Sequence, residues 1–201
     1  MAARDAHRAA VYAAEDQVAR TVERANRTSG GHVDFFGSSL TLPPERRFAD
    51  VASVQRYVDA VLGLAWVSGR WPGLPACRVR ERSGQTRATY EPGSGQPPCI
   101  AVPLATRWAG RELVVLHEIA HHLVAHSAVG DEPSHGPTFT GTFLALVEVV
   151  VGAEVALLLR AALHGAGVPV GPVRPSSTAG PGPRTEAPTA PAARAADPDG
   201  A

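Results

Sequence analysis

Apolar residues recur at helical spacing in four parts of the chain, and this pattern predicts most of the fold. Residues 4–26 and 49–64 carry apolar side chains three and four positions apart, which is typical of amphipathic helices. Residues 110–127 repeat the pattern, and residues 138–164 are apolar on most of the helical circumference. A helix that is apolar nearly all round belongs in a protein core. We therefore expect four helices, with the last at the centre of the core.

Between the second and third helices the apolar period changes to two residues, which is typical of strands. Residues 77–92 alternate as in a β-hairpin with its turn at residues 83–85, and residues 99–102 form another short apolar run. This arrangement predicts a small meander just before the third helix. Residues 99–102 are either an exposed edge that pairs with an extended peptide or an ordinary member of the sheet.

The whole pattern predicts an α+β fold, in which a small antiparallel or mixed sheet packs on the third helix between flanking N- and C-terminal helices. Composition places this domain at residues 1–166. Residues 167–201 contain eight of the eighteen prolines and no aromatic residue. Such a segment cannot bury enough surface to order itself, so we expect a disordered tail.

Charge and cysteine content narrow the class of protein. Nineteen basic residues balance nineteen acidic ones, which gives no electrostatic reason to expect nucleic acid or an anionic membrane as partner. Glu148 and Glu154 interrupt the longest apolar run, which favours a buried helix over a membrane span. Cys77 and Cys99 are too few for a disulfide framework. With no apolar signal segment at the N-terminus, we expect a cytoplasmic protein.

Five of the eight histidines lie within residues 117–139, and the first two belong to an HExxH motif. Residues four apart on a helix project from nearly the same side, so His117 and His121 can offer two imidazoles to one ion. Glu118 lies about 100° around the helix, beside the ion, where a general base is needed. The motif predicts one Zn²⁺ per chain, with Glu118 as the base.

A catalytic zinc site usually has three protein ligands and one open position. Ser127 occupies the position where a HExxHxxGxxH motif has its third histidine, so that subclass is excluded. His135, just before the start of the fourth helix, is the favoured third ligand, and Glu148 is the alternative. His122 and His126 point in other directions around the helix and are expected to be polar residues outside the site.

The segments HEIAHHL and HGPTF, at residues 117–123 and 135–139, resemble the SprT-like branch of zinc metalloproteases, whose third histidine lies in an HG-x-x-[FW] segment. Still more similar is a family of uncharacterised actinobacterial proteins described as metallohydrolases. That resemblance runs through RDAHRAAVYAAE, CRVRERSGQTRATY, LHEIAHHL and the segment from HGPTF to HGAGV, and covers most of residues 4–168.

The resemblance implies a zincin-like fold with His117, His121 and His135 as zinc ligands and Glu118 as catalytic base. SprT-like proteases that act on DNA-bound proteins generally carry an additional zinc-binding or DNA-binding module. This chain has only two cysteines and no basic cluster, which argues against that role.

The leading hypothesis is a minimal zincin, a metallopeptidase that hydrolyses a peptide or protein substrate with a zinc-activated water and Glu118. The same site could act on another amide. A regulator-cleaving metallopeptidase with Glu148 as third ligand is a further alternative. In a different class, the zinc is structural, closed by His126 or Asp131, and the protein is an interaction module. Tyr90, His126 and several arginines are candidates for stabilising an oxyanion.

Overall fold

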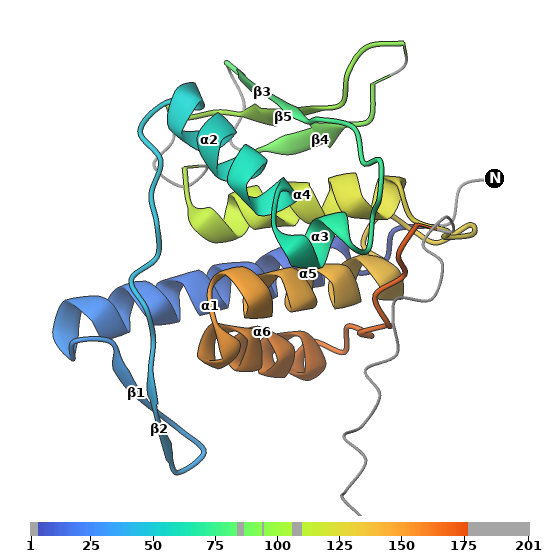
Figure 1. Cartoon of the computed structure of the whole chain (residues 1–201). Helices are drawn as coiled ribbons and strands as arrows, with labels where there is room; N and C mark the ends of the chain where they lie inside the picture. The colour runs from blue at the N-terminus through green and yellow to red at the C-terminus, as the bar shows by residue number, and fades with distance from the viewer. Residues whose placement is uncertain (1–3, 84–86, 94, 106–109, 177–201) are drawn as a thin grey trace, which may run out of the picture.

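The computed structural model describes residues 4–83, 87–93, 95–105 and 110–176, which form an α+β fold (Figure 1). Its elements in chain order are α1 (Arg8–Thr28), β1 (His32–Phe35), β2 (Ser38–Thr41), α2 (Val51–Leu62), α3 (Ala65–Ser68), β3 (Arg78–Glu81), β4 (Thr89–Glu91), β5 (Cys99–Val102), α4 (Glu112–Ala125), α5 (Pro137–Val150) and α6 (Ala153–Gly165).

The three-stranded sheet is mixed, as the α+β prediction allowed, but its strand order differs from the predicted meander. The order is β3-β5-β4, with β5 parallel to β3 and antiparallel to β4. The predicted β3–β4 hairpin is therefore wrong, and so is the exposed-edge role for β5. The central position of β5 is indicated by its own apolar run, in which Ile100, Ala101 and Val102 are all buried. A continuous apolar run is typical of a strand covered on both faces.

The predicted helix over residues 138–164 is two helices. The break falls at Gly152, whose φ of +137° is a backbone conformation that only glycine adopts readily. After this turn α6 packs on both α5 and α1. Within the described ranges, no helix has the length and apolar character needed to cross a bilayer.

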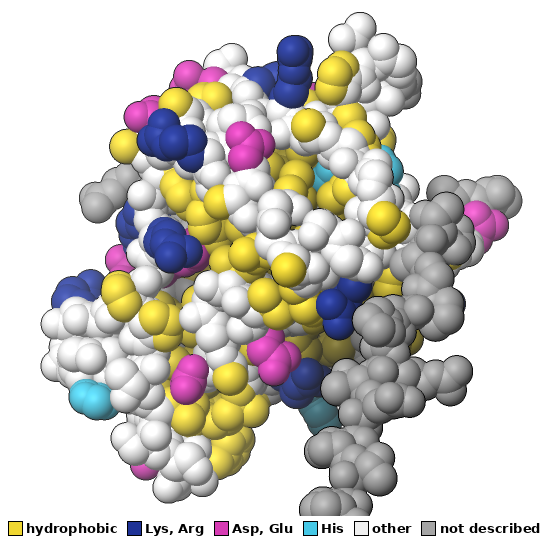
Figure 2. All heavy atoms as spheres, viewed as in Figure 1, with side chains coloured by type: hydrophobic (Ala, Val, Ile, Leu, Met, Phe, Trp, Pro, Cys, Tyr) yellow, Lys and Arg dark blue, Asp and Glu magenta, His cyan; other side chains and the backbone are white. Residues whose placement is uncertain are grey.

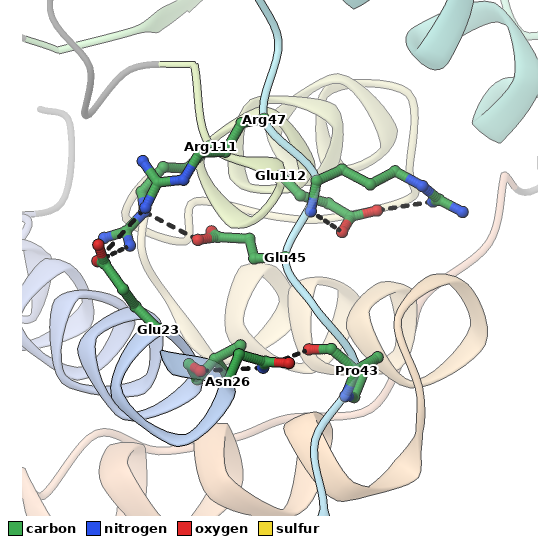
Figure 3. A network of polar contacts seen from close by, with 9 residues as sticks. Glu23, Asn26, Pro43, Glu45, Arg47, Arg111 and Glu112 are labelled. Carbon is green, nitrogen blue, oxygen red and sulfur yellow. Dashed lines mark hydrogen bonds and ion pairs between the residues drawn. The ribbon is translucent and has the colours of Figure 1, made fainter. Parts of the chain in front are cut away.

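Helix α4 lies between the sheet and the layer formed by α1 and α5 (Figure 1). It is buried along almost its whole length. A polar network fixes its first turn (Figure 3). The guanidinium of Arg111, just before α4, is buried and pairs with Glu23 and Glu45. The carboxylate of Glu112 accepts hydrogen bonds from Arg46 and Tyr57.

The chain remains attached to the domain beyond residue 167, where we expected a disordered tail to begin. Val168 is buried. The Gly171 amide donates to the Pro137 carbonyl and the Ser176 amide to the Arg70 carbonyl. The part of the tail up to Ser176 thus packs on the domain, because its valines find apolar surface. Residues 177–201 lie outside the described part of the chain.

Candidate metal centre

Three histidines converge on one side of α4. His117 and His121 project from the helix, and His135 reaches the same point from the loop just before α5. The Nε2 atoms of His121 and His135 each lie 3.2 Å from Nε2 of His117. Within the described ranges, these three residues are the one group of histidine, cysteine or acidic side chains arranged to hold a metal ion.

The two distances from Nε2 of His117 fit a tetrahedral ion. Two nitrogens that are each about 2.05 Å from a tetrahedral zinc ion lie about 3.3 Å apart. Burial, and then the neighbouring imidazoles, hold the pKa of His117 and His121 well below the usual range. A neutral imidazole is the form that binds a metal. The group could therefore hold a metal ion, and its dimensions suit zinc.

Carboxylates from the N-terminal part of the chain hold the far sides of two of these rings. Nδ1 of His117 lies 2.9 Å from a carboxylate oxygen of Glu15, and Nδ1 of His135 lies 2.7 Å from one of Asp5. When each carboxylate is ionised, Nδ1–H donates to it and Nε2 carries only a lone pair. Two lone pairs 3.2 Å apart repel each other unless a cation lies between them. Such carboxylate–histidine pairs orient metal ligands.

The sequence reasoning missed Asp5 and Glu15. A signal existed for Glu15, because it lies on the apolar side of α1 beside Val11, Ala14 and Val18, and like them it is buried. An acidic residue on an apolar helix face needs a polar partner from elsewhere in the fold.

Glu118 lies beside the histidines without belonging to the group of three. Its side chain is buried, and it lines a cleft of about 580 Å³ together with His121 and His135. Burial, and then the charge of the nearby Glu15, raise the pKa of Glu118 to about 8, although a hydrogen bond from the Tyr90 backbone acts in the opposite sense. The structure thus places a buried carboxyl group, able to hold a proton near neutral pH, next to a possible metal position.

Helix α1, strand β4 and the loop before α5 form the rest of the cleft wall. Arg8 and Tyr12 come from α1, Thr89 and Tyr90 from β4, and Phe139 from the first turn of α5. The rings of Tyr12 and Phe139 lie against the imidazoles of His117 and His121 respectively, with centroids 4.8 Å and 4.2 Å apart. These apolar faces shield the imidazoles from water on one side.

His122 and His126 face away from the group, as the helical spacing predicted. Nε2 of His122 lies 3.0 Å from the Pro75 carbonyl and Nδ1 lies 3.2 Å from the Tyr90 hydroxyl. Nδ1 of His126 lies 2.8 Å from the His122 carbonyl. Both residues therefore use their ring nitrogens for hydrogen bonds within the protein.

The structure does not bring the alternative ligands to the three histidines. Glu148 is exposed on α5 and lies outside the group. His126 and Asp131, considered as a fourth donor for a structural zinc site, also lie outside it. Comparisons of the chain with protein-family models, with curated proteins and with solved structures give no match.

Proposed function

We propose that this protein is a zinc-dependent metallohydrolase of the zincin type that cleaves a peptide or amide bond. One observation carries the proposal. Three imidazoles lie close enough together to hold one ion, and two of them, His121 and His135, line the same cleft as Glu118, a buried carboxyl group outside the ligand set. A structural zinc site would be closed by four protein ligands. It would leave Glu118 buried without a purpose.

The residues divide the chemical work between them. When bound, zinc would polarise the substrate carbonyl and increase the acidity of a water molecule. Glu118 would accept the proton of the attacking water and deliver it to the leaving amine. Asp5 and Glu15 would keep the rings of His135 and His117 in place throughout.

The position of β4 favours an extended peptide as the substrate. Within the described residues β4 is hydrogen-bonded to β5 along one edge only, and Thr89 and Tyr90 line the cleft. A peptide that pairs with the other edge of β4 would lie across the cleft and be held through its main chain. Strand β4 would thus have the peptide-pairing role that was one of the two alternatives for residues 99–102.

The surface charges are consistent with such a substrate. On the face of the molecule seen in Figure 2, the basic and acidic side chains of the described residues are interspersed. This pattern gives no preference for a polyanion such as nucleic acid.

Zinc content, followed by proteolysis, tests the proposal. Elemental analysis of the purified wild type, Glu118→Gln and Glu148→Gln should find about one zinc per chain in each, because none of these changes removes a ligand. His135→Ala should lose its zinc. Zinc-loaded wild type should then cleave an unfolded protein such as casein, and Glu118→Gln should not.

Two results would count against the assignment. Zinc lost from Glu148→Gln but retained by His135→Ala would make Glu148 the third ligand. A wild type that holds no zinc after metal has been supplied would end the metallohydrolase proposal.

A further inference from the structure

We propose that Tyr12 is a catalytic residue, the hydrogen-bond donor that stabilises the negative charge formed on the substrate carbonyl oxygen. This inference rests on the proposed function and assigns a role that the sequence motif leaves open. Tyr12 belongs to α1, more than a hundred positions before the histidines, and no sequence pattern connects it with them.

Tyr12 lies at the metal centre. Its ring stacks on the imidazole of His117 with centroids 4.8 Å apart and an angle of 17° between the planes. Its ring centroid lies 5.4 Å from that of His135. It lines the cleft together with Glu118 and His121. A phenol in this position is next to both the ligands and the base.

The hydroxyl of Tyr90, which the sequence analysis considered for this role, is already engaged. The Pro75 carbonyl can only accept a hydrogen bond, so Nε2 of His122 must carry the proton that it shares with Pro75. Nδ1 of the same neutral ring is then an acceptor, and the Tyr90 hydroxyl donates to it at 3.2 Å. A phenol has a single proton, so Tyr90 has none left for an oxyanion.

His126, which was also considered for this role, is engaged as well, because its Nδ1 donates to the His122 carbonyl at 2.8 Å. The hydroxyl of Tyr12 makes no hydrogen bond to any of the described residues. Tyr12 lines the cleft beside the histidines, and its neutral hydroxyl has a proton that no hydrogen bond to the described residues uses.

Two arginines hold the Tyr12 ring and add positive charge around it. The guanidinium carbon of Arg87 lies 4.2 Å from the ring centroid and that of Arg8 lies 5.9 Å away. Both distances are within the range of cation–π attraction. The cations restrain the ring, and their charge favours a negative oxygen near the phenol.

Hydrolysis would proceed by attack of water on the carbonyl carbon, followed by departure of the amine. The water oxygen bonds to the carbonyl carbon, its proton passes to Glu118, and the carbonyl π electrons move to the oxygen. Tyr12 donates a hydrogen bond to that oxygen and keeps its proton. The electron pair then re-forms the carbonyl, the carbon–nitrogen bond breaks, and Glu118 gives its proton to the amine. Donors placed where such charge develops contribute strongly to catalysis.

Acetohydroxamate, a small zinc-binding anion whose oxygens resemble the oxyanion, is the probe. Its dissociation constant would be measured by calorimetry on zinc-loaded wild type, Tyr12→Phe and Tyr57→Phe. Loss of a hydrogen bond to a charged group should weaken binding to Tyr12→Phe at least tenfold, roughly, while its zinc content is unchanged. Tyr57→Phe, at a tyrosine that does not line the cleft, is the matched control and should bind within about twofold of wild type.

A second measurement needs no variant of Tyr12. The chain has three tyrosines, so labelling with ¹³Cζ-tyrosine gives three signals, which Tyr57→Phe and Tyr90→Phe assign. Addition of acetohydroxamate to the zinc-loaded protein should move the Tyr12 signal and leave the other two in place. If Tyr12→Phe fails to fold, this titration decides.

Failures of the two proposals have different signatures. If wild type binds zinc and the probe, but Tyr12→Phe binds the probe equally well, the role of Tyr12 is overturned and the metallohydrolase stands. Zinc loss from Tyr12→Phe would reduce Tyr12 to a support for His117 and would also overturn its catalytic role. Wild type without zinc would overturn both proposals.

Discussion

The two halves of α1 each direct carboxylates towards α4, but the groups that they meet there differ. In the second half, Glu23 pairs with the guanidinium of Arg111, which also binds Glu45 (Figure 3). In the first half, Glu15 meets the imidazole of His117. Arginine carries a permanent positive charge, whereas a buried imidazole is neutral. The network at the start of α4 therefore contains a permanent positive charge, whereas the imidazole that Glu15 meets carries none of its own.

The pKa values of the two glutamates express this difference. The hydrogen bond from Arg111 and its charge lower the pKa of Glu23. Burial, and then the charge of Asp16, raise the pKa of Glu15 to about 8. Glu23 is also partly exposed to water, while Glu15 is not. The arginine network should thus serve stability at all times, and the histidine network should gain its stability from a metal.

The largest effect is expected from Arg111→Met, which leaves the buried carboxylate of Glu45 without its partner. Removal of one member of a buried ion pair costs about 3–5 kcal/mol. Urea unfolding should find this loss both with zinc and with a chelator. Arg160→Met, at an exposed position on α6, is the control and should change the unfolding free energy by about 0.5 kcal/mol or less. A loss that appears only in the absence of zinc would couple the two networks.

His122 is a buried histidine, and both of its ring nitrogens are hydrogen-bonded to protein groups. Burial lowers its pKa in the folded protein to about 4, below the ordinary value of 6.5. The unfolded chain therefore takes up a proton between these pH values and the folded chain does not, so stability is complete above pH 6.5 and falls as the pH drops towards 4. Between pH 7 and pH 4.5, in a chelator, wild type should lose about 2–3 kcal/mol more than His122→Gln. Equal losses would show that His122 titrates normally.

Zinc should stabilise the histidine network by mass action. Free zinc at about a hundred times its dissociation constant should add about 2.7 kcal/mol to the unfolding free energy. Denaturant titration with zinc or a chelator measures this gain. His121→Ala should show none of it, while Arg160→Met should retain it in full. A gain that persists in His121→Ala would place the zinc elsewhere.

The smallest effect is expected from the carboxylates behind the ligands. Glu15→Gln keeps the shape of the side chain but removes the charge that orients His117, and should weaken zinc binding about 10–100-fold. Competition with a chromophoric chelator gives the dissociation constant. Asp16→Asn removes the neighbouring charge and should bind zinc with nearly wild-type affinity. If both variants bind equally tightly, Glu15 does not act on the metal.

Local patterns predicted those parts of the molecule that local geometry determines. Helical spacing alone brings His117 and His121 to one side of α4, and the position of His135 before a helix start indicated the third nitrogen. The strand order could not be predicted, because alternation identifies a strand but not its neighbour. The break at Gly152 was hidden in an apolar run, since only the backbone conformation reveals it.

The carboxylates that contact the histidines come from the N-terminal part of the chain, far from the histidines in sequence. Asp5 meets His135 across 130 positions, and Glu15 meets His117 across 102. Nothing in the residues adjacent to Tyr12 indicates that its ring lies on His117. Such groups become visible only when the packing of α1 on α4 is known.

The long separation between Asp5 and His135 has a consequence for how the protein is made. Ribosomes add about 5–20 residues per second, so Asp5 is synthesised on the order of ten seconds before its partner. During that interval the nascent chain holds Asp5 without the imidazole that it meets in the folded protein. The group of three histidines therefore forms only after α1 to α4 have been made, and any ion that it holds would be captured after most of the domain has been synthesised.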